Sequence, residues 1–120
     1  MRNPAQLGAE ILEVDPSFLR VLVLSKTGGE LAHVYSRDYP SKSRLGKKTE
    51  EKYGLIDTLF LETFAQEEKS YGKMNFILVV FETSKVMLMQ SKKEGVYLAA
   101  RIPRAANAEY LFTKTKPILD

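Results

Sequence analysis

The sequence predicts an α/β domain of the α+β kind, in which helices pack on a five-stranded antiparallel sheet. Hydrophobic residues make up 44% of the 120 residues and charged residues 28%, which is typical of a chain that folds around a core. Helical and strand patterns follow in the order helix, two strands, long helix, three strands, helix. Short turns between consecutive strands favour antiparallel pairing. We expect residues 1–120 to form a single domain.

The N-terminal helix is expected over residues 4–12. Asn3 can cap it, Pro4 suits its first position, and Gln6 stands where a capping box places its second member. Pro16 is expected to end the helix, because the residue before a proline disfavours α geometry.

A β-hairpin is expected next, with strands at residues 18–24 and 30–35. The first strand is rich in branched and aromatic residues, and Gly28 and Gly29 suit a turn with positive φ. The first strand is apolar on both faces, as in a central strand, whereas the second is shorter and more mixed, as in an edge strand.

A long central helix is expected from about Thr49 to Lys69, with Glu50 and Glu51 favourably placed in its first turn. Apolar residues recur along it at spacings of three and four, and the apolar face is wider than one sheet can cover. These residues are Tyr53, Leu55, Ile56, Leu59, Phe60, Leu61 and Phe64.

Three strands and a C-terminal helix complete the pattern. The strands are expected at residues 74–81, 86–90 and 96–102, the first of them apolar on both faces. Gly72 separates the long helix from these strands, and Pro103 ends them. The last helix is expected to begin near Ala105 or Asn107 and to stop at Pro117.

No catalytic arrangement is recognisable in the sequence. The absence of cysteine excludes thiolate metal sites and cysteine nucleophiles. His33 is the only histidine and has no nucleophile motif near it, so we interpret it as a half-exposed strand residue. The glycines at 28–29 do not belong to a phosphate-binding loop pattern. We expect no enzymatic activity, no cofactor and no metal site.

The sequence shows neither a signal-peptide pattern nor a membrane-spanning pattern. Residues 1–7 lack the long apolar region of a signal peptide, and no apolar run approaches the ~20 residues that span a bilayer. We expect a cytoplasmic protein.

The basic residues of the chain concentrate in the stretch 36–48, which we expect to be an exposed loop. Its five cations can attract phosphates, acidic proteins or anionic lipid headgroups, although a merely solvated loop explains them equally well. These cations are Arg37, Lys42, Arg44, Lys47 and Lys48. Binding of nucleic acid or anionic lipid through this loop is the alternative to protein binding. It ranks lower because Tyr39 is the only aromatic residue of the loop.

Two parts of the chain resemble the roadblock / dynein light chain family. Residues 21–32, with glycines after a polar turn, are similar to the opening hairpin of that family. Residues 95–102 followed by 105–111 resemble its last strand and the small-residue and asparagine start of its last helix. The basic loop and the glycine-free turn at 83–84 depart from the family pattern. Longin-like and profilin-like proteins share much of the topology.

The resemblance implies a non-catalytic dimeric adaptor or scaffold, formed as a homodimer or as a heterodimer with a roadblock-like subunit. Proteins of that family lay their central helices together and join edge strands, and they serve as platforms for small GTPases, motors or signalling complexes. We therefore expect a dimer, and the resemblance implies a small Ras-like GTPase as a partner that it regulates. The positions that match the dimer interface are Tyr53, Ile56, Phe60, Phe64, Asn75, Ile77 and Val79.

Overall fold

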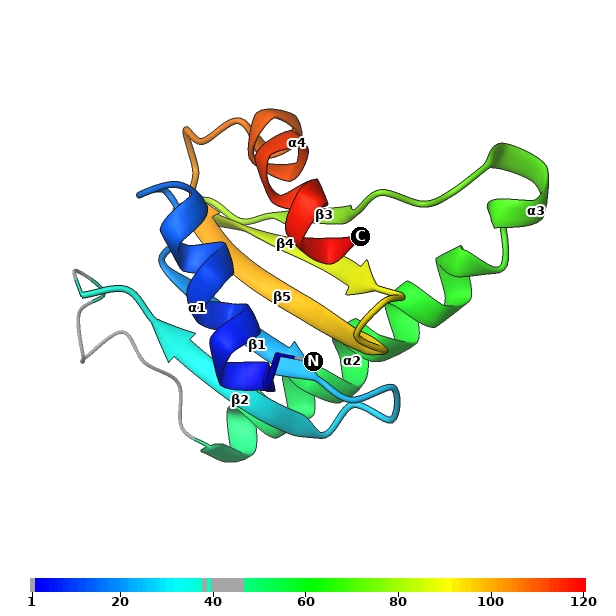
Figure 1. Ribbon diagram of the computed structural model, residues 1–120, viewed down its shortest axis with the longest axis horizontal. Coiled ribbons are helices and arrows are strands. Elements are labelled where there is room, and N and C mark those ends of the chain that lie inside the picture. The colour runs from blue at the N-terminus through cyan, green and yellow to red at the C-terminus, as the bar shows by residue number, and fades with distance from the viewer. Residues whose placement is uncertain (1, 38, 40–46) are drawn as a thin grey trace.

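The computed structural model describes the backbone of residues 2–37, 39 and 47–120, and the side chains of the same residues except 47–53. Its five strands form one antiparallel sheet with the order β2-β1-β5-β4-β3, which confirms the predicted fold class (Figure 1). The strands are β1 (Arg20–Leu24), β2 (Glu30–Tyr35), β3 (Ile77–Val80), β4 (Ser84–Ser91) and β5 (Val96–Pro103). The helices are α1 (Pro4–Val14), α2 (Lys47–Ala65), α3 (Glu68–Tyr71) and α4 (Ala108–Leu119).

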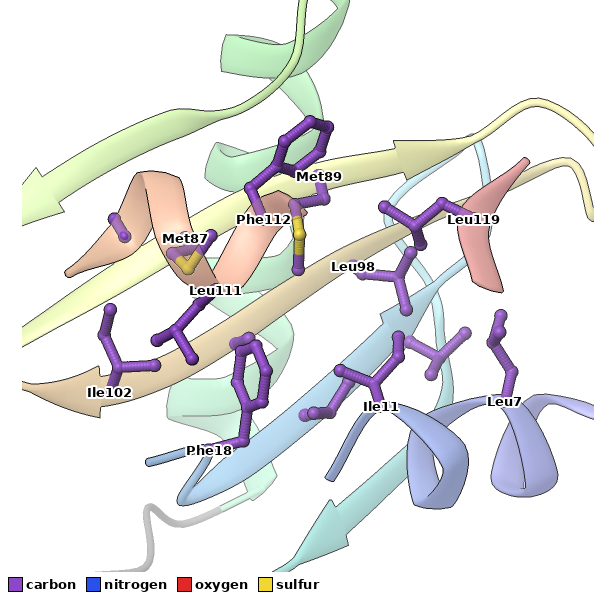
Figure 2. Close-up of a cluster of buried hydrophobic side chains, with 14 of the residues drawn as sticks. Leu7, Ile11, Phe18, Met87, Met89, Leu98, Ile102, Leu111, Phe112 and Leu119 are labelled. Atoms are coloured by element: carbon purple, nitrogen blue, oxygen red, sulfur yellow. The ribbon is translucent and has the colours of Figure 1, made fainter. Parts of the chain in front are cut away.

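Helices cover both faces of this sheet. Figure 1 shows α1 and α4 in front of the sheet and α2 behind it. Alternate residues of β1 enter the two cores: Val21 and Val23 point toward α1 and α4, whereas Leu22 and Leu24 point toward α2. The core on the α1 and α4 side is drawn in Figure 2 and includes Leu7, Ile11, Phe18, Met87, Met89, Leu98, Ile102, Leu111, Phe112 and Leu119.

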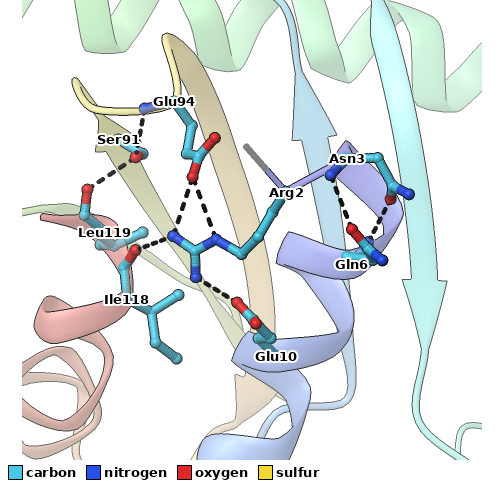
Figure 3. Close-up of polar contacts among 8 residues, drawn as sticks. All are labelled: Arg2, Asn3, Gln6, Glu10, Ser91, Glu94, Ile118 and Leu119. Atoms are coloured by element: carbon cyan, nitrogen blue, oxygen red, sulfur yellow. Dashed lines mark hydrogen bonds and ion pairs between the residues drawn. The ribbon is translucent and has the colours of Figure 1, made fainter.

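The start of α1 confirms the predicted capping box. The side chain of Asn3 accepts a hydrogen bond from the backbone N–H of Gln6 at 2.8 Å, and the side chain of Gln6 accepts one from the N–H of Asn3 at 3.1 Å (Figure 3). Both donors belong to the first turn, which has no intrahelical acceptors. The helix ends at Val14, two residues beyond the predicted end and before the Asp15–Pro16 step.

Arg2 joins segments that are far apart in the sequence (Figure 3). Its guanidinium donates to the Glu94 carboxylate at 3.1 and 3.2 Å and to the Ile118 carbonyl at 2.7 Å, and it also pairs with Glu10. These bonds link α1, the β4–β5 turn and the last turn of α4. The position of α4 is therefore fixed by charge-assisted bonds as well as by its apolar face.

The predicted long helix is divided in the structure. It begins at Lys47 instead of Thr49, although lysines are unfavourable at the positive end of a helix dipole. It ends at Ala65, where the N–H of Glu67 bonds to the carbonyl of Phe64 at 3.0 Å. The short helix α3 follows and stops at Gly72, whose φ of 88° suits glycine.

The Glu68 carboxylate holds α3 in place and explains a further difference from the predicted elements. It accepts bonds from the backbone N–H of Met74 at 2.7 Å and from the side chains of Lys92 and Gln90 at 3.3 and 3.5 Å. These contacts hold α3 against β4. Because the N–H of Met74 is bound by a side chain, the ladder with β4 begins only at Ile77, and β3 is shorter than the predicted strand 74–81.

Pro117 does not stop α4, contrary to the prediction. The helix continues to Leu119, and the N–H of Asp120 bonds to the carbonyl of Lys116 at 3.0 Å. A proline in the last turn removes only one intrahelical bond. Leu119 is 3% exposed, and its carbonyl accepts a bond from the Ser91 hydroxyl at 2.8 Å, so tertiary contacts hold the turn that follows the proline.

We predict that Gly54→Ala destabilises the protein. An added Cβ would lie 2.9 Å from the carbonyl oxygen of Gly28, in the β1–β2 turn, and 2.9 Å from Leu24 Cδ2. Alanine in a helix is favoured over glycine by about 1 kcal/mol, but overpacking against backbone costs about 1–3 kcal/mol. We expect a net loss in the free energy of unfolding, measured by urea denaturation.

The control is Thr63→Ala, which places alanine at an exposed position of the same helix. It is expected to leave stability unchanged or slightly raised. A Gly54→Ala protein as stable as the parent would contradict the close approach of α2 to the β1–β2 turn.

Candidate partner-binding surface

Helix α2 buries only part of its apolar face. Leu61 is completely buried among side chains of β1, β4 and β5, and Glu62 accepts a hydrogen bond from the Tyr97 hydroxyl at 3.1 Å. Burial and this carboxylate raise the pKa of Tyr97 to about 12. The other large apolar side chains of α2 that the structure describes stay exposed, between 37% for Ile56 and 66% for Leu59. The sequence-based expectation that one sheet cannot cover this helix is therefore confirmed.

Strand β3 forms one end of the sheet. Its four residues pair with β4 on one side, and no described strand pairs with it on the other. Val80 and the following Phe81 are each about half exposed. An edge strand exposes unpaired backbone N–H and C=O groups, which are a template for pairing with another chain.

The exposed side of α2 and the β3 edge share one surface. Ile56 and Phe60 line a cavity together with Val79 and Phe81, and Phe64 lines a second hollow together with Ile77. We call this candidate site the partner-binding surface, and its exposed apolar members are Leu55, Ile56, Leu59, Phe60, Phe64, Val80 and Phe81. Apolar patches of this kind mark interaction sites in soluble proteins.

The sequence-predicted interface residues divide into four groups. Ile56, Phe60 and Phe64 are exposed on α2; Asn75 is exposed just before β3; Ile77 and Val79 are half-buried against the core on the α2 side; and the side chain of Tyr53 lies outside the description.

Four exposed members were not among the predicted interface residues. Leu55 and Leu59 were predicted only as part of the wide apolar face of the helix, although their spacing of four residues places them on one ridge. Val80 and Phe81 could not have been identified in this way, because their exposure depends on β3 lying at the edge of the sheet.

Of the five basic residues predicted to bind an anion or partner, the structure describes the side chain of only one. Arg37 is exposed. Lys42 and Arg44 lie outside the described residues, and Lys47 and Lys48 belong to the first turn of α2, with side chains that are not described. Helix α2 thus takes the last two residues of the predicted loop 36–48.

Tyr39 is buried within this loop, although we expected the loop to be exposed. It is 8% exposed and lies 5.3 Å from Tyr35, centroid to centroid. An aromatic ring beside β2 therefore anchors part of the segment that follows this strand.

His33 is held among neighbours on the α2 side of β2 and is more buried than predicted. Its side chain is 7% exposed, and its ring stacks on Tyr35 with centroids 4.3 Å apart. Arg20 Nη1 lies 3.1 Å from Nε2, and a guanidinium can only donate, so Nε2 accepts and the proton of the neutral ring sits on Nδ1. The Tyr35 hydroxyl and a Glu30 carboxylate oxygen lie 3.1 and 3.5 Å from Nδ1. These contacts give His33 a structural role in the sheet.

Among the described side chains of α2, Asp57 is the ionisable group that lines the cavity in this surface. Burial raises the pKa of its carboxyl to about 6, and the charge of Arg20 acts in the opposite direction. The ionised form is therefore less stable in the folded protein than in the unfolded chain.

The described part of the chain has neither a metal-binding cluster nor a membrane-spanning helix. No group of three or more His, Asp or Glu side chains there could hold a metal ion. None of the described helices combines the length and the apolar character needed to cross a bilayer.

Solved structures with the same arrangement identify the fold. A Roadblock/LC7 domain from Streptomyces avermitilis matches with a TM-score of 0.72 and 12% identity over 98% of this chain and 92% of that one. The gliding protein MglB from Thermus thermophilus matches at 0.71 and 12%, over 100% and 88% of the two chains. MglB from Myxococcus xanthus matches at 0.67 and 9%, over 96% and 89%. No protein-family model and no curated protein matches the sequence. The chain has the roadblock fold.

We predict that Asp57→Asn stabilises the protein at pH 7. Because the folded-state pKa of about 6 exceeds the ordinary value of 3.8, stability falls as pH rises from about 4 through 6. The uncharged amide of asparagine avoids this loss of stability. Because solvent screens the partly exposed carboxylate, we expect the free energy of unfolding to rise by only about 1 kcal/mol at pH 7 and not at all at pH 4. Urea denaturation at the two pH values measures it.

Glu13→Gln, which removes an exposed carboxylate from α1, controls for the loss of one negative charge. An equal gain for Asp57→Asn at both pH values would show that burial of the Asp57 charge is not its source.

Proposed function

We propose that the protein is a non-catalytic adaptor that forms a dimer through α2 and β3. The observation that carries this proposal is the partner-binding surface, where one helix and one edge strand expose large apolar side chains side by side. Burying apolar surface contributes a favourable free energy of about 25 cal/mol for each Å², which is missing while these side chains stay in water. A second subunit that covers them recovers this free energy.

The composition of β3 supports its use in pairing. Edge strands that avoid association carry charged residues or proline, whereas β3 consists of Ile77, Leu78, Val79 and Val80. The opposite edge, β2, carries Glu30 and His33 and is packed against α1. The two edges of the sheet thus differ, and β3 is the one suited to meet a second copy.

A two-fold arrangement suits both elements. In a symmetric dimer the same patch of each subunit meets itself, so two β3 strands extend the sheet and two α2 helices pack beside each other on one face. A roadblock-like subunit of a different sequence would use the same surface as a heterodimer. One of the solved structures of similar fold is MglB in a tetrameric arrangement, with a TM-score of 0.72.

The adaptor role extends to a further partner. The roadblock resemblance implies a small Ras-like GTPase as the class of protein that such a dimer regulates. In the proposed dimer, α1 and α4 stay on the opposite face of the sheet from the interface and are free to receive other proteins.

Sedimentation velocity at micromolar concentration tests the dimer. We expect a species of twice the 13.6 kDa chain mass, and we expect Phe60→Asp to weaken self-association by a factor of about 100, because it places a charge in an apolar interface. Tyr110→Asp is the control, since Tyr110 is a comparably exposed aromatic residue on α4. A protein that stays monomeric up to about 100 μM and is unaffected by Phe60→Asp would contradict the proposal.

Binding to Ras-like GTPases of the same organism tests the second part. Each GTPase is loaded with GDP or with a non-hydrolysable GTP analogue and titrated with the dimer. We expect at least one to bind with an affinity that depends on the nucleotide, because regulation requires different affinities for the two states. Equal binding, or none, in both states across the panel would refute GTPase regulation and leave the dimer proposal standing.

A further inference from the structure

A cavity of about 440 Å³ opens in the partner-binding surface, between α2 and the sheet. This volume falls in the range of small-molecule sites, roughly 300–1,000 Å³. Its walls are mainly apolar, and its polar lining comes from two arginines, one aspartate and two hydroxyl residues. The polar lining residues are Arg20, Arg101, Asp57, Thr83 and Ser84.

The two arginines lie next to each other. Arg20 on β1 and Arg101 on β5 are direct partners in the antiparallel ladder, so both side chains project from the same face of the sheet. Like charges at directly opposite positions destabilise a sheet. Arg20 is moreover 7% exposed, and burying a cation is costly unless an anion accompanies it.

Only some of the hydrogen-bond donors of the Arg20 guanidinium have an acceptor among the described residues. Its Nη1 bonds to the neutral ring of His33, and its buried Nε–H has no hydrogen-bond partner among the described residues. Arg20 also forms no ion pair with any described carboxylate. A buried, charged donor that lacks an acceptor and lines a cavity is suited to an anionic ligand.

Other residues of the cavity wall can contact both the anionic head and the apolar part of such a ligand. Arg101 donates to the Ser84 hydroxyl and lies over the ring of Phe81 at 6.0 Å, which orients its guanidinium at the cavity wall. Phe60 and Val79 supply apolar walls on the side of α2 and β3. Apolar walls lower the local dielectric and strengthen the attraction between an anion and the arginines.

We propose that this cavity binds a small organic anion, with its carboxylate or phosphate head on Arg20 and Arg101 and its apolar body against Phe60 and Val79. Asp57 lies in the same cavity and opposes the anion when it is ionised. The head group is placed chiefly by Arg20, whose buried Nε–H has no acceptor among the described residues. Phe60 and Phe81 also belong to the partner-binding surface, so a second subunit on that surface would lie over the cavity, and the probes are titrated at protein concentrations where the chain is monomeric.

Titration calorimetry with three six-carbon probes tests the site. Hexanoate and hexyl phosphate present the two head groups, and hexanol presents the same chain without charge. We expect at least one anion to bind at least 10-fold more tightly than hexanol, and the tighter of the two identifies the head group. Shifts in the methyl NMR signals of Val79 and Val86 should locate the probe, because both residues line the cavity.

Two variants move the affinity in opposite directions. Arg20→Gln is expected to weaken anion binding at least 10-fold. Asp57→Asn removes the opposing charge and is expected to strengthen it several-fold at pH 7. Because Asp57→Asn is also expected to stabilise the fold, it gives a valid readout even if Arg20→Gln folds poorly.

The proposal is overturned if the three probes bind equally, if none binds, or if Asp57→Asn leaves anion affinity unchanged. Sedimentation of the same samples separates this result from the dimer proposal. Head-group dependence is required of the monomeric protein, in which the cavity is open, whereas loss of the dimer alone affects only the proposed function.

Discussion

In β1 and β5, neighbouring side chains point into different cores, because residues of a strand alternate between the two faces of a sheet. Both strands are apolar on both faces, so each face needs a helical cover. Two helices, α1 and α4, cover one face, and α2 alone covers the other. One helix cannot shield five strands, and the uncovered part lies toward β3. The partner-binding surface and the cavity beneath it both follow from this asymmetry.

The same asymmetry explains why charged groups occur in the core between the sheet and α2. On the α2 side of the sheet, Arg20 precedes Leu22 on β1 and Arg101 follows Ala99 on β5, so two cations stand beside a row of apolar residues. Asp57 reaches toward them from the helix and loses solvent in doing so, which raises its pKa. The buried Asp57 carboxylate and the Arg20 donor without an acceptor both lower the stability of the fold here, next to an exposed apolar surface. That combination is typical of binding sites.

Much of the fold could be predicted from the sequence because its signals are local. The capping box at Asn3 and Gln6, the glycines of the first turn and the apolar spacing along α2 all act within a few residues. The exposed side of α2 could be predicted for the same reason, since an apolar stripe that is too wide for a sheet is visible in the spacing itself. The roadblock fold follows from the order of these elements.

The sequence by itself determined the number, order and type of the main elements and which helix would be left with apolar residues in water. Tertiary structure alone decided where α2 ends, how short β3 is, that α4 continues past Pro117, and that Arg20 faces Arg101. The physical reason is that these features depend on bonds between distant segments. The Glu68 carboxylate takes the N–H of Met74, Ser91 holds the carbonyl of Leu119, and the β1–β5 ladder sets the arginines opposite each other. Local periodicity carries no information about such partners.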